Sequence, residues 1–230
     1  MSASGRRRGF EAILELGMAV CLAAGVSAWA QGENGRFAPA DVTSAGEIAY
    51  PMNAAQGGLV SLLVKLDESG ASQGLQVLQD VPPLTGAAKE GVKTWTFQAA
   101  VAHGKNVASY FPVQVVFNPY NPGGTAVLGG GPRVPPAVPS NLGHSLPPQV
   151  RRASYAFYPP DTQAQGTVVL SVEIGKAGHV GNIKVVHGVP ALNQAAIDAL
   201  KQWGFQPAMA DGQTRAGRMC VAFVFQRNLS

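Results

Sequence analysis

The residues that could support acid–base or metal chemistry are few and widely spaced. The histidines are His103, His144, His179 and His187. No two of them have the i, i+4 spacing that would place two metal ligands on one helix face, and no acidic cluster accompanies them. The tripeptide 143–145, Gly-His-Ser, lacks the trailing glycine of a nucleophile elbow, and no glycine-rich phosphate loop precedes a helix. We therefore predict that the protein is not an enzyme, with no catalytic residues, no metal site and no cofactor.

Charge and cysteine usage also limit the possible functions. The net charge is +4 with 13% charged residues, which is too weak and too scattered for nucleic-acid binding. The basic residues of the second half are expected to be solvated charges at a strand edge or, alternatively, a face that attracts acidic or anionic envelope partners. They are Arg151, Arg152, Arg215, Arg218 and Arg227. Cys21 falls in a leader segment, so Cys220 is expected to be a lone thiol, half-buried beside a neighbouring surface or, alternatively, disulfide-linked to another molecule.

Periodic apolar residues predict three strands and a helix between residues 166 and 225. The first strand has apolar residues at every second position: Val168, Leu170, Val172 and Ile174. After a turn at residues 176–178, Ile183 and Val185 are expected to lie on one face of a second strand. A helix opens at Pro190 and is expected to end at Gly204 in a left-handed conformation. The third strand has one apolar face, formed by Met219, Val221, Phe223 and Phe225.

The same pattern occurs earlier in the chain, 108 positions upstream and without a gap. Gly58 corresponds to Gly166, and Trp95 corresponds to Trp203. A register kept over some sixty positions indicates a tandem duplication. We therefore predict an α+β protein with two tandem domains, at residues 47–118 and 151–228. Each domain is expected to be a three-stranded antiparallel sheet with one helix packed on it, in the order β-β-α-β.

These residues resemble the carboxy-terminal domain of TonB proteins, the periplasmic ends of energy transducers that drive outer-membrane receptors. The resemblance is close over residues 155–226 and looser over 47–118, and its most specific part is a W-x-F-x-P-A signature. The signature residues are Trp203, Phe205, Pro207 and Ala208. The first copy has Ala99 in place of the proline, Thr96 in place of Gly204, and a helix weakened by Gly91 by about 1 kcal/mol relative to alanine. It is thus expected to be the copy that has lost or changed its binding role.

The resemblance implies a binding site at the last strand. In the family, this strand captures a short receptor segment as an added strand, so the matching positions 218–225 are the expected acceptor. The candidate partner-binding residues are Tyr158, Pro159, Arg218, Cys220, Ala222 and Val224. The expected partners are outer-membrane receptor segments or other envelope proteins, and the implied process is TonB-dependent transmembrane transport. The alternative is a structural envelope module whose domains pair with each other, dimerise or tether envelope material without energy transduction. A free strand edge favours peptide capture, whereas an edge consumed by domain pairing favours the structural module.

The remaining segments are predicted to lie outside the two domains. Residues 1–30 resemble a signal peptide, with Arg6-Arg7-Arg8, an apolar stretch at 18–26 and Ala28-Trp29-Ala30 before Gln31. The alternative is a retained inner-membrane anchor over residues 12–30. In both cases the body of the protein is expected in the periplasm. Residues 31–46 are predicted to be a short amino-terminal linker. Residues 119–150 are predicted to be a Pro/Gly-rich linker without regular structure.

Overall fold

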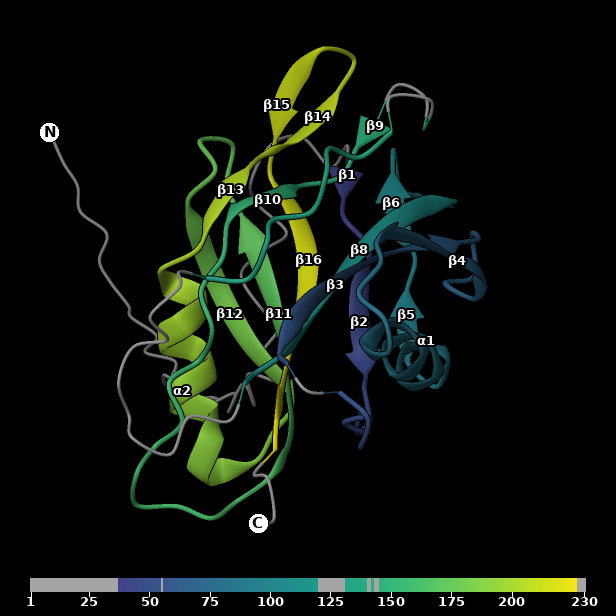
Figure 1. Ribbon diagram of the computed structural model, residues 1–230. Helices are drawn as coiled ribbons and strands as arrows, with labels where there is room; N and C mark the ends of the chain where they lie inside the picture. The colour runs from purple at the N-terminus through teal and green to yellow at the C-terminus, as the bar shows by residue number, and fades with distance from the viewer. Residues whose placement is uncertain (1–36, 55, 120–130, 140–141, 143–144, 227–230) are drawn as a thin grey trace, which may run out of the picture. The chain divides into compact units, whose positions relative to one another are not determined.

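The computed structural model describes residues 37–54, 56–119, 131–139, 142 and 145–226, all within one compact unit, residues 35–230 (Figure 1). The predicted leader at residues 1–30, including Cys21, lies outside the described residues. The first structural repeat, residues 37–117, contains β1 (Phe37–Ala38), β2 (Asp41–Ser44), β3 (Gly58–Leu66), β4 (Ser72–Gln79), α1 (Leu84–Lys93), β5 (Thr96–Gln98), β6 (Ala100–Ala102), β7 (Lys105–Val107) and β8 (Ser109–Phe117). The second repeat, residues 145–225, contains β9 (Ser145–Leu146), β10 (Gln149–Arg152), β11 (Gly166–Ile174), β12 (Val180–His187), α2 (Pro190–Lys201), β13 (Gly204–Gln206), β14 (Ala208–Ala210), β15 (Gln213–Arg215) and β16 (Gly217–Phe225).

Each strand of the first repeat has a counterpart 108 residues later, with the same bounds. The helices end 108 residues apart as well, but α2 begins two residues earlier than the position equivalent to the start of α1. The equivalence extends further toward the amino terminus than the expected domain boundaries. β2 lies inside residues 31–46, which were expected to be a linker, while β9 and the start of β10 lie inside 119–150.

The principal strands of both repeats form one continuous six-stranded sheet, not two separate three-stranded sheets. Its order is β12-β11-β16-β8-β3-β4. Within each repeat the pairing is antiparallel, but β16 and β8 pair in parallel, with Cys220 opposite Val113 and Val224 opposite Phe117. The last strands of the two repeats therefore complete each other's sheet edges. The prediction of a three-stranded sheet for each domain is corrected accordingly, since the two antiparallel sets of strands are joined in one sheet.

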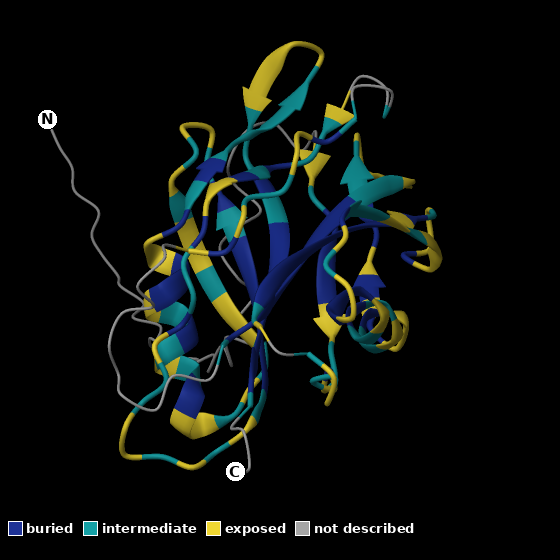
Figure 2. Cartoon of the chain, in the orientation of Figure 1, coloured by how far each residue is buried: buried dark blue, intermediate teal, exposed yellow. Residues whose placement is uncertain are grey.

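A hydrophobic core lies on each face of this sheet, and each core is covered by one helix (Figures 1 and 2). Successive residues of a strand point to opposite faces, so β16 contributes to both cores. Met219 and Phe223 pack in the core under α2, whereas Cys220 and Ala222 pack in the core under α1. In return, Val116 of β8 packs in the core under α2. The two central strands are therefore buried on both faces, and each repeat completes the other's core.

Local features of the second repeat agree with the sequence in part. Gly178 adopts a left-handed conformation (φ 80°) in the turn between β11 and β12. The helix starts at Pro190 as predicted, but its end does not involve Gly204. Gln202 caps α2 with an ordinary right-handed conformation (φ −87°), and Gly204 begins β13. Val185, expected on a buried face, is 38% exposed because β12 is an edge strand.

Each repeat contains a short hairpin between its helix and its last strand, and neither hairpin was predicted from the sequence. The β6–β7 hairpin turns at His103-Gly104 and the β14–β15 hairpin at Asp211-Gly212. All four turn residues have positive φ, between 51° and 75°. Positive φ at both central residues is the requirement of a type I′ turn, for which Asp-Gly is a favoured sequence. The Asp-Gly pair was therefore a sequence signal for the second hairpin.

Candidate functional site

The expected peptide-binding strand is the centre of the sheet. β16 is bonded to β11 on one side and to β8 on the other. Cys220, Ala222 and Val224 are at most 2% exposed and lie in the core under α1. Arg218, at the start of the strand, forms an ion pair with Asp41. In this structure an added peptide could pair with β16 only by displacing β8 or β11.

Tyr158 and Pro159 lie apart from those residues. Both are half-buried in the segment before β11. The Tyr158 ring packs edge-on against Phe225, with a centroid separation of 6.0 Å, and its hydroxyl donates a hydrogen bond to the carbonyl of Ala164. Phe225 belongs to the core under α2. Tyr158 therefore contributes to the second repeat's core, and the structure does not bring the six candidate residues into one site.

The outer edges of the sheet are β12 and β4. No described strand pairs with the outer side of either. β12 carries the exposed Val185 and two neighbouring half-buried residues, Val186 and His187. β4 is richer in polar residues and contains Gly74 with φ 150°, a conformation that favours glycine. Sheet edges of this kind present unpaired backbone donors and acceptors to an incoming strand.

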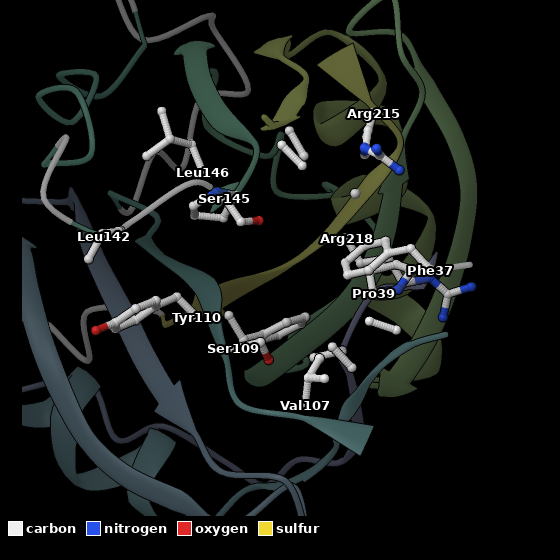
Figure 3. Close-up of a pocket in the computed structure, with 18 of the residues that line it drawn as sticks. Phe37, Pro39, Val107, Ser109, Tyr110, Leu142, Ser145, Leu146, Arg215 and Arg218 are labelled. Carbon is white, nitrogen blue, oxygen red and sulfur yellow. The ribbon is translucent and has the colours of Figure 1, made fainter. Parts of the chain in front are cut away.

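A cleft of about 470 Å³ lies between the two sets of short strands (Figure 3). The first repeat contributes residues of β1, β6, β7 and β8 to its lining, and the second contributes residues of β9, β14, β15 and β16. Equivalent positions face the cleft from both repeats, such as Pro39 and Pro147, or Ala100 and Ala208. The predictions from sequence identified no such cleft, because it is built from the hairpins that they missed.

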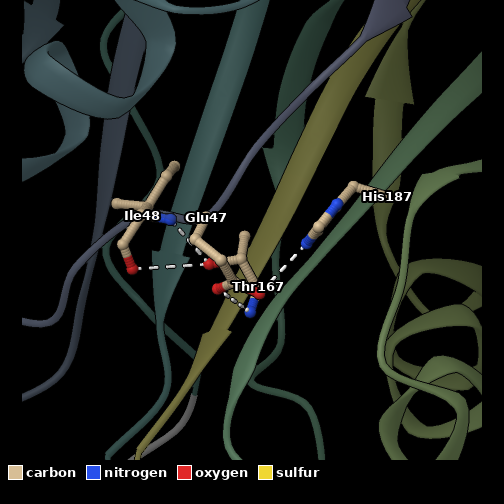
Figure 4. A network of polar contacts seen from close by, with 4 residues as sticks. All are labelled: Glu47, Ile48, Thr167 and His187. Atoms are coloured by element: carbon tan, nitrogen blue, oxygen red, sulfur yellow. Dashed lines mark hydrogen bonds and ion pairs between the residues drawn. The ribbon is translucent and has the colours of Figure 1, made fainter.

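A polar network joins the segment after β2 to the second repeat (Figure 4). The Glu47 carboxylate accepts a hydrogen bond from the backbone N–H of Thr167 (2.8 Å) and lies 3.0 Å from His187 Nε2. The hydroxyl of Thr167 accepts a bond from the backbone N–H of Ile48 (2.9 Å). These contacts attach the first repeat's amino-terminal segment to strands of the second repeat. His187 is thereby given a structural role.

A second junction contact centres on Asp41 of β2. Its carboxylate accepts a hydrogen bond from Ser171 Oγ (2.5 Å) and pairs with Arg218. Burial raises the pKa of the Cys220 thiol well above its usual value, and the charge of Asp41 adds to this rise. The thiol therefore stays protonated at neutral pH, where a protonated thiol is a poor nucleophile and metal ligand.

The described residues show no grouping suited to metal binding. No three His, Cys, Asp or Glu side chains among them are placed to share a metal ion. His103 lies at a hairpin tip, His179 in the turn before β12, and His144 is outside the described residues. Of the two described helices, neither is long and apolar enough to cross a membrane.

The fold is that of an α+β protein in which two equivalent repeats share one sheet. The chain belongs to the family described as Gram-negative bacterial TonB protein C-terminal, which matches it twice, over residues 46–119 and 154–226. It is also similar to Protein TonB from two strains of Xanthomonas campestris pv. campestris, with 34% identity over 94 residues. The match covers 39% of this chain and 42% of each relative, so the chain spans less than half of their length. No solved structure matches it.

Proposed function

We propose that this chain is a periplasmic envelope protein that binds an extended segment of a partner protein as an added strand at the outer edge of β12. The observation that carries the proposal is the open outer side of β12 in a family associated with the cell envelope. Strand addition takes its affinity from backbone hydrogen bonds and its selectivity from alternate side chains. The expected partners are envelope proteins, including segments of outer-membrane receptors, and the expected process is TonB-dependent transport.

β12 is favoured over the other strands for three reasons. β16, the acceptor implied by the family resemblance, already has partners on both sides. β4 contains Gly74 with a positive φ, and its exposed residues are Ser72, Gln73, Gly74 and Gln76, with no exposed apolar or charged side chain. β12 offers the exposed Val185 and the exposed cation Lys184 on opposite faces, so an incoming strand would find one apolar and one basic neighbour.

The pairing of β8 with β16 favours a second candidate function. The two repeats occupy each other's acceptor edges, as expected of a structural envelope module that pairs its sheets and captures no peptide. In that case the protein would tether envelope material or assemble with further copies, without energy transduction. The two candidates differ in whether any extended peptide binds.

A reversible disulfide between β8 and β16 distinguishes peptide binding at β12 from peptide binding at β16, and both from the absence of peptide binding. Cys220 lies opposite Val113 in neighbouring strands, and both side chains are buried in the same core. Adjacent strands lie about 4.8 Å apart, within the range of about 4.4–6.8 Å that disulfides span between Cα atoms. The substitution Val113→Cys, made with Cys21→Ser so that only the intended pair can form, should therefore cross-link the central strands on oxidation.

The measurement is the affinity for ten-residue peptides from the amino-terminal segments of outer-membrane receptors of the same cell. We expect equal affinity before and after oxidation, with hydrogen-exchange protection gained along Val180–His187. The equivalent strand Ser72–Gln79 of the first repeat is the internal control and should remain unprotected. Binding that is lost on oxidation and restored by reduction would instead assign the peptide to β16. If no peptide binds in either state, the structural module is the better description.

The periplasmic location has its own test, the mass of the protein recovered from the native envelope. A chain that starts at Gln31 in the soluble periplasmic fraction is the expected result, because residues 28–30 form a small-x-small cleavage pattern. An intact amino terminus in the inner-membrane fraction would instead establish a retained anchor and favour energy transduction.

A further inference from the structure

The cleft between the hairpins is built symmetrically but has two chemically different sides. At equivalent positions that line it, the first repeat has Val107 and Tyr110 where the second has Arg215 and Arg218. The first repeat also contributes Phe37, Phe111 and the Ser109 hydroxyl. We call the first repeat's side, whose lining also includes Lys65 and His103, the apolar wall, because these positions hold aromatic and aliphatic residues. We call the second repeat's side the basic wall, because it carries both arginines among otherwise largely apolar residues.

Among the described residues, Arg215 on the basic wall has no ion-pair partner. Arg218 already pairs with Asp41. Arg215 Nε is buried and has no hydrogen-bond partner among the described residues, and the same is true of Ser109 Oγ on the opposite wall. Lys65, which also lines the cleft, is solvent-exposed, and the acidic Asp211 is exposed at the hairpin tip. Figure 3 shows Ser109 and Arg215 on different strands of the cleft lining.

Two buried polar atoms without partners are costly, because each loses its bonds to water without gaining a replacement. An acceptor bound in the cleft beside Arg215 would give its Nε a hydrogen-bond partner. A carboxylate suits this geometry because its two oxygens match the planar fork of a guanidinium, and its single charge is neutralised by a single arginine. The apolar wall requires that the rest of the ligand be apolar. The volume of about 470 Å³ falls within the range of pockets for small ligands.

We propose that this cleft binds a carboxylate carried on an apolar body, with the charge at Arg215 and the body against the apolar wall. Such a group occurs in free aliphatic acids and in the carboxyl terminus of a peptide that ends in apolar residues. The site is separate from the outer edge of β12 and does not depend on the function proposed for that edge.

The test compares acids with their neutral amides on the full chain. The probes are octanoate against octanamide, and acetyl-Ala-Leu-Phe with a free carboxylate against the same peptide as its amide. We expect at least one acid to bind at least about tenfold more tightly than its amide, since hydrogen bonds to charged groups are among the strongest in proteins. The backbone amide signals of Ala208–Ala210, which line the cleft, should shift on binding. The acid that binds identifies the source of the carboxylate.

Variants assign the effect to Arg215. Arg215→Gln should reduce acid binding to the level of the amide, whereas Arg215→Lys should retain part of it because the charge stays but the fork is lost. Arg152→Gln removes an exposed arginine that lies outside both the cleft lining and β12, and it is the matched control. Ser109→Ala provides a second variant on the other wall, should either Arg215 variant fail to fold. Equal binding of acids and amides, equal loss in Arg215→Gln and Arg152→Gln, or no binding of any probe would overturn the proposal.

Discussion

Cys220 is a residue whose surroundings come from both repeats. It lies on a strand of the second repeat, yet its side chain is fully buried in the core covered by α1 of the first repeat. The expected half-buried thiol beside a neighbouring surface is in fact completely enclosed. Because burial and the nearby Asp41 charge disfavour the thiolate, the pKa of Cys220 is raised in the folded state.

This shift predicts a loss of stability at alkaline pH. The unfolded thiol titrates near pH 8.5, whereas the folded thiol keeps its proton, so above that pH the unfolded state binds fewer protons. Below about pH 8, the titration of Cys220 should therefore not change the free energy of unfolding. Above about pH 8.5 it should fall by up to about 1.4 kcal/mol per pH unit.

The measurement is urea unfolding at intervals from pH 7 to pH 9.5 for the natural protein and Cys220→Ala. The variant should lack this part of the alkaline decline, although lost packing lowers its stability at every pH. The range stops below the titration of Tyr50 and Tyr155, whose pKa values are also raised by burial. Parallel pH profiles for the two proteins would contradict the prediction.

At the scale of elements, the helices show why one glycine is required and another is not. Gly91 in α1 was expected to weaken that helix, but the structure gives it a packing role. A Cβ there would lie 2.6 Å from Ile48 Cγ1, while a Cβ on Gly86 of the same helix would meet nothing within 4 Å. Ile48 belongs to the core under α1 and bonds to Thr167 through its backbone N–H. Gly91 therefore lets the junction segment pack closely on α1.

These two glycines make a matched pair of substitutions. Gly86→Ala should raise the free energy of unfolding by about 0.4–1 kcal/mol, because alanine has less conformational freedom to lose and meets no neighbour. Gly91→Ala should lower it by about 1–3 kcal/mol, because overpacking against Ile48 exceeds the gain in helix propensity. Urea unfolding of both variants measures the difference. Equal stabilisation by the two alanines would show that Ile48 does not constrain the helix.

At the scale of the whole molecule, the shared cores should make the two repeats unfold together. Val169 and Val224 of the second repeat pack in the core under α1, and Leu59 and Val116 of the first repeat pack in the core under α2. If one repeat unfolded alone, the apolar residues that it contributes to the other repeat's core would be exposed to solvent. We therefore expect a single cooperative transition, although the sequence suggests two domains.

Single-tryptophan variants can test this cooperativity. Trp95 and Trp203 are each 4% exposed, one in the core of each repeat. With Trp29→Phe in both, Trp203→Phe leaves a probe in the first repeat and Trp95→Phe leaves one in the second. In each variant, the urea transition by fluorescence should coincide with that by far-ultraviolet circular dichroism, which reports on the whole chain. Transitions that separate in either variant would indicate that the repeats unfold independently.

Local sequence patterns were sufficient to identify the repeat, the family, the long strands and both helices. The 108-residue register located β3, β4, β8 and their counterparts, since strand periodicity and turn glycines act over a few residues. The candidate binding residues Cys220, Ala222 and Val224 were placed on the correct strand. They were assigned an outward face because the prediction considered one repeat at a time.

The residues that pack against this outward face of β16 are known only from the tertiary structure. The nearly continuous apolar run from Met219 to Phe225 is typical of a strand buried on both sides, but a run of this kind does not name the partner. The pairing of β16 with β8 depends on residues more than one hundred positions apart, and so does the cleft that joins the two sets of hairpins. Such contacts depend on which surfaces can be buried together in three dimensions, and local periodicity carries no information about that choice.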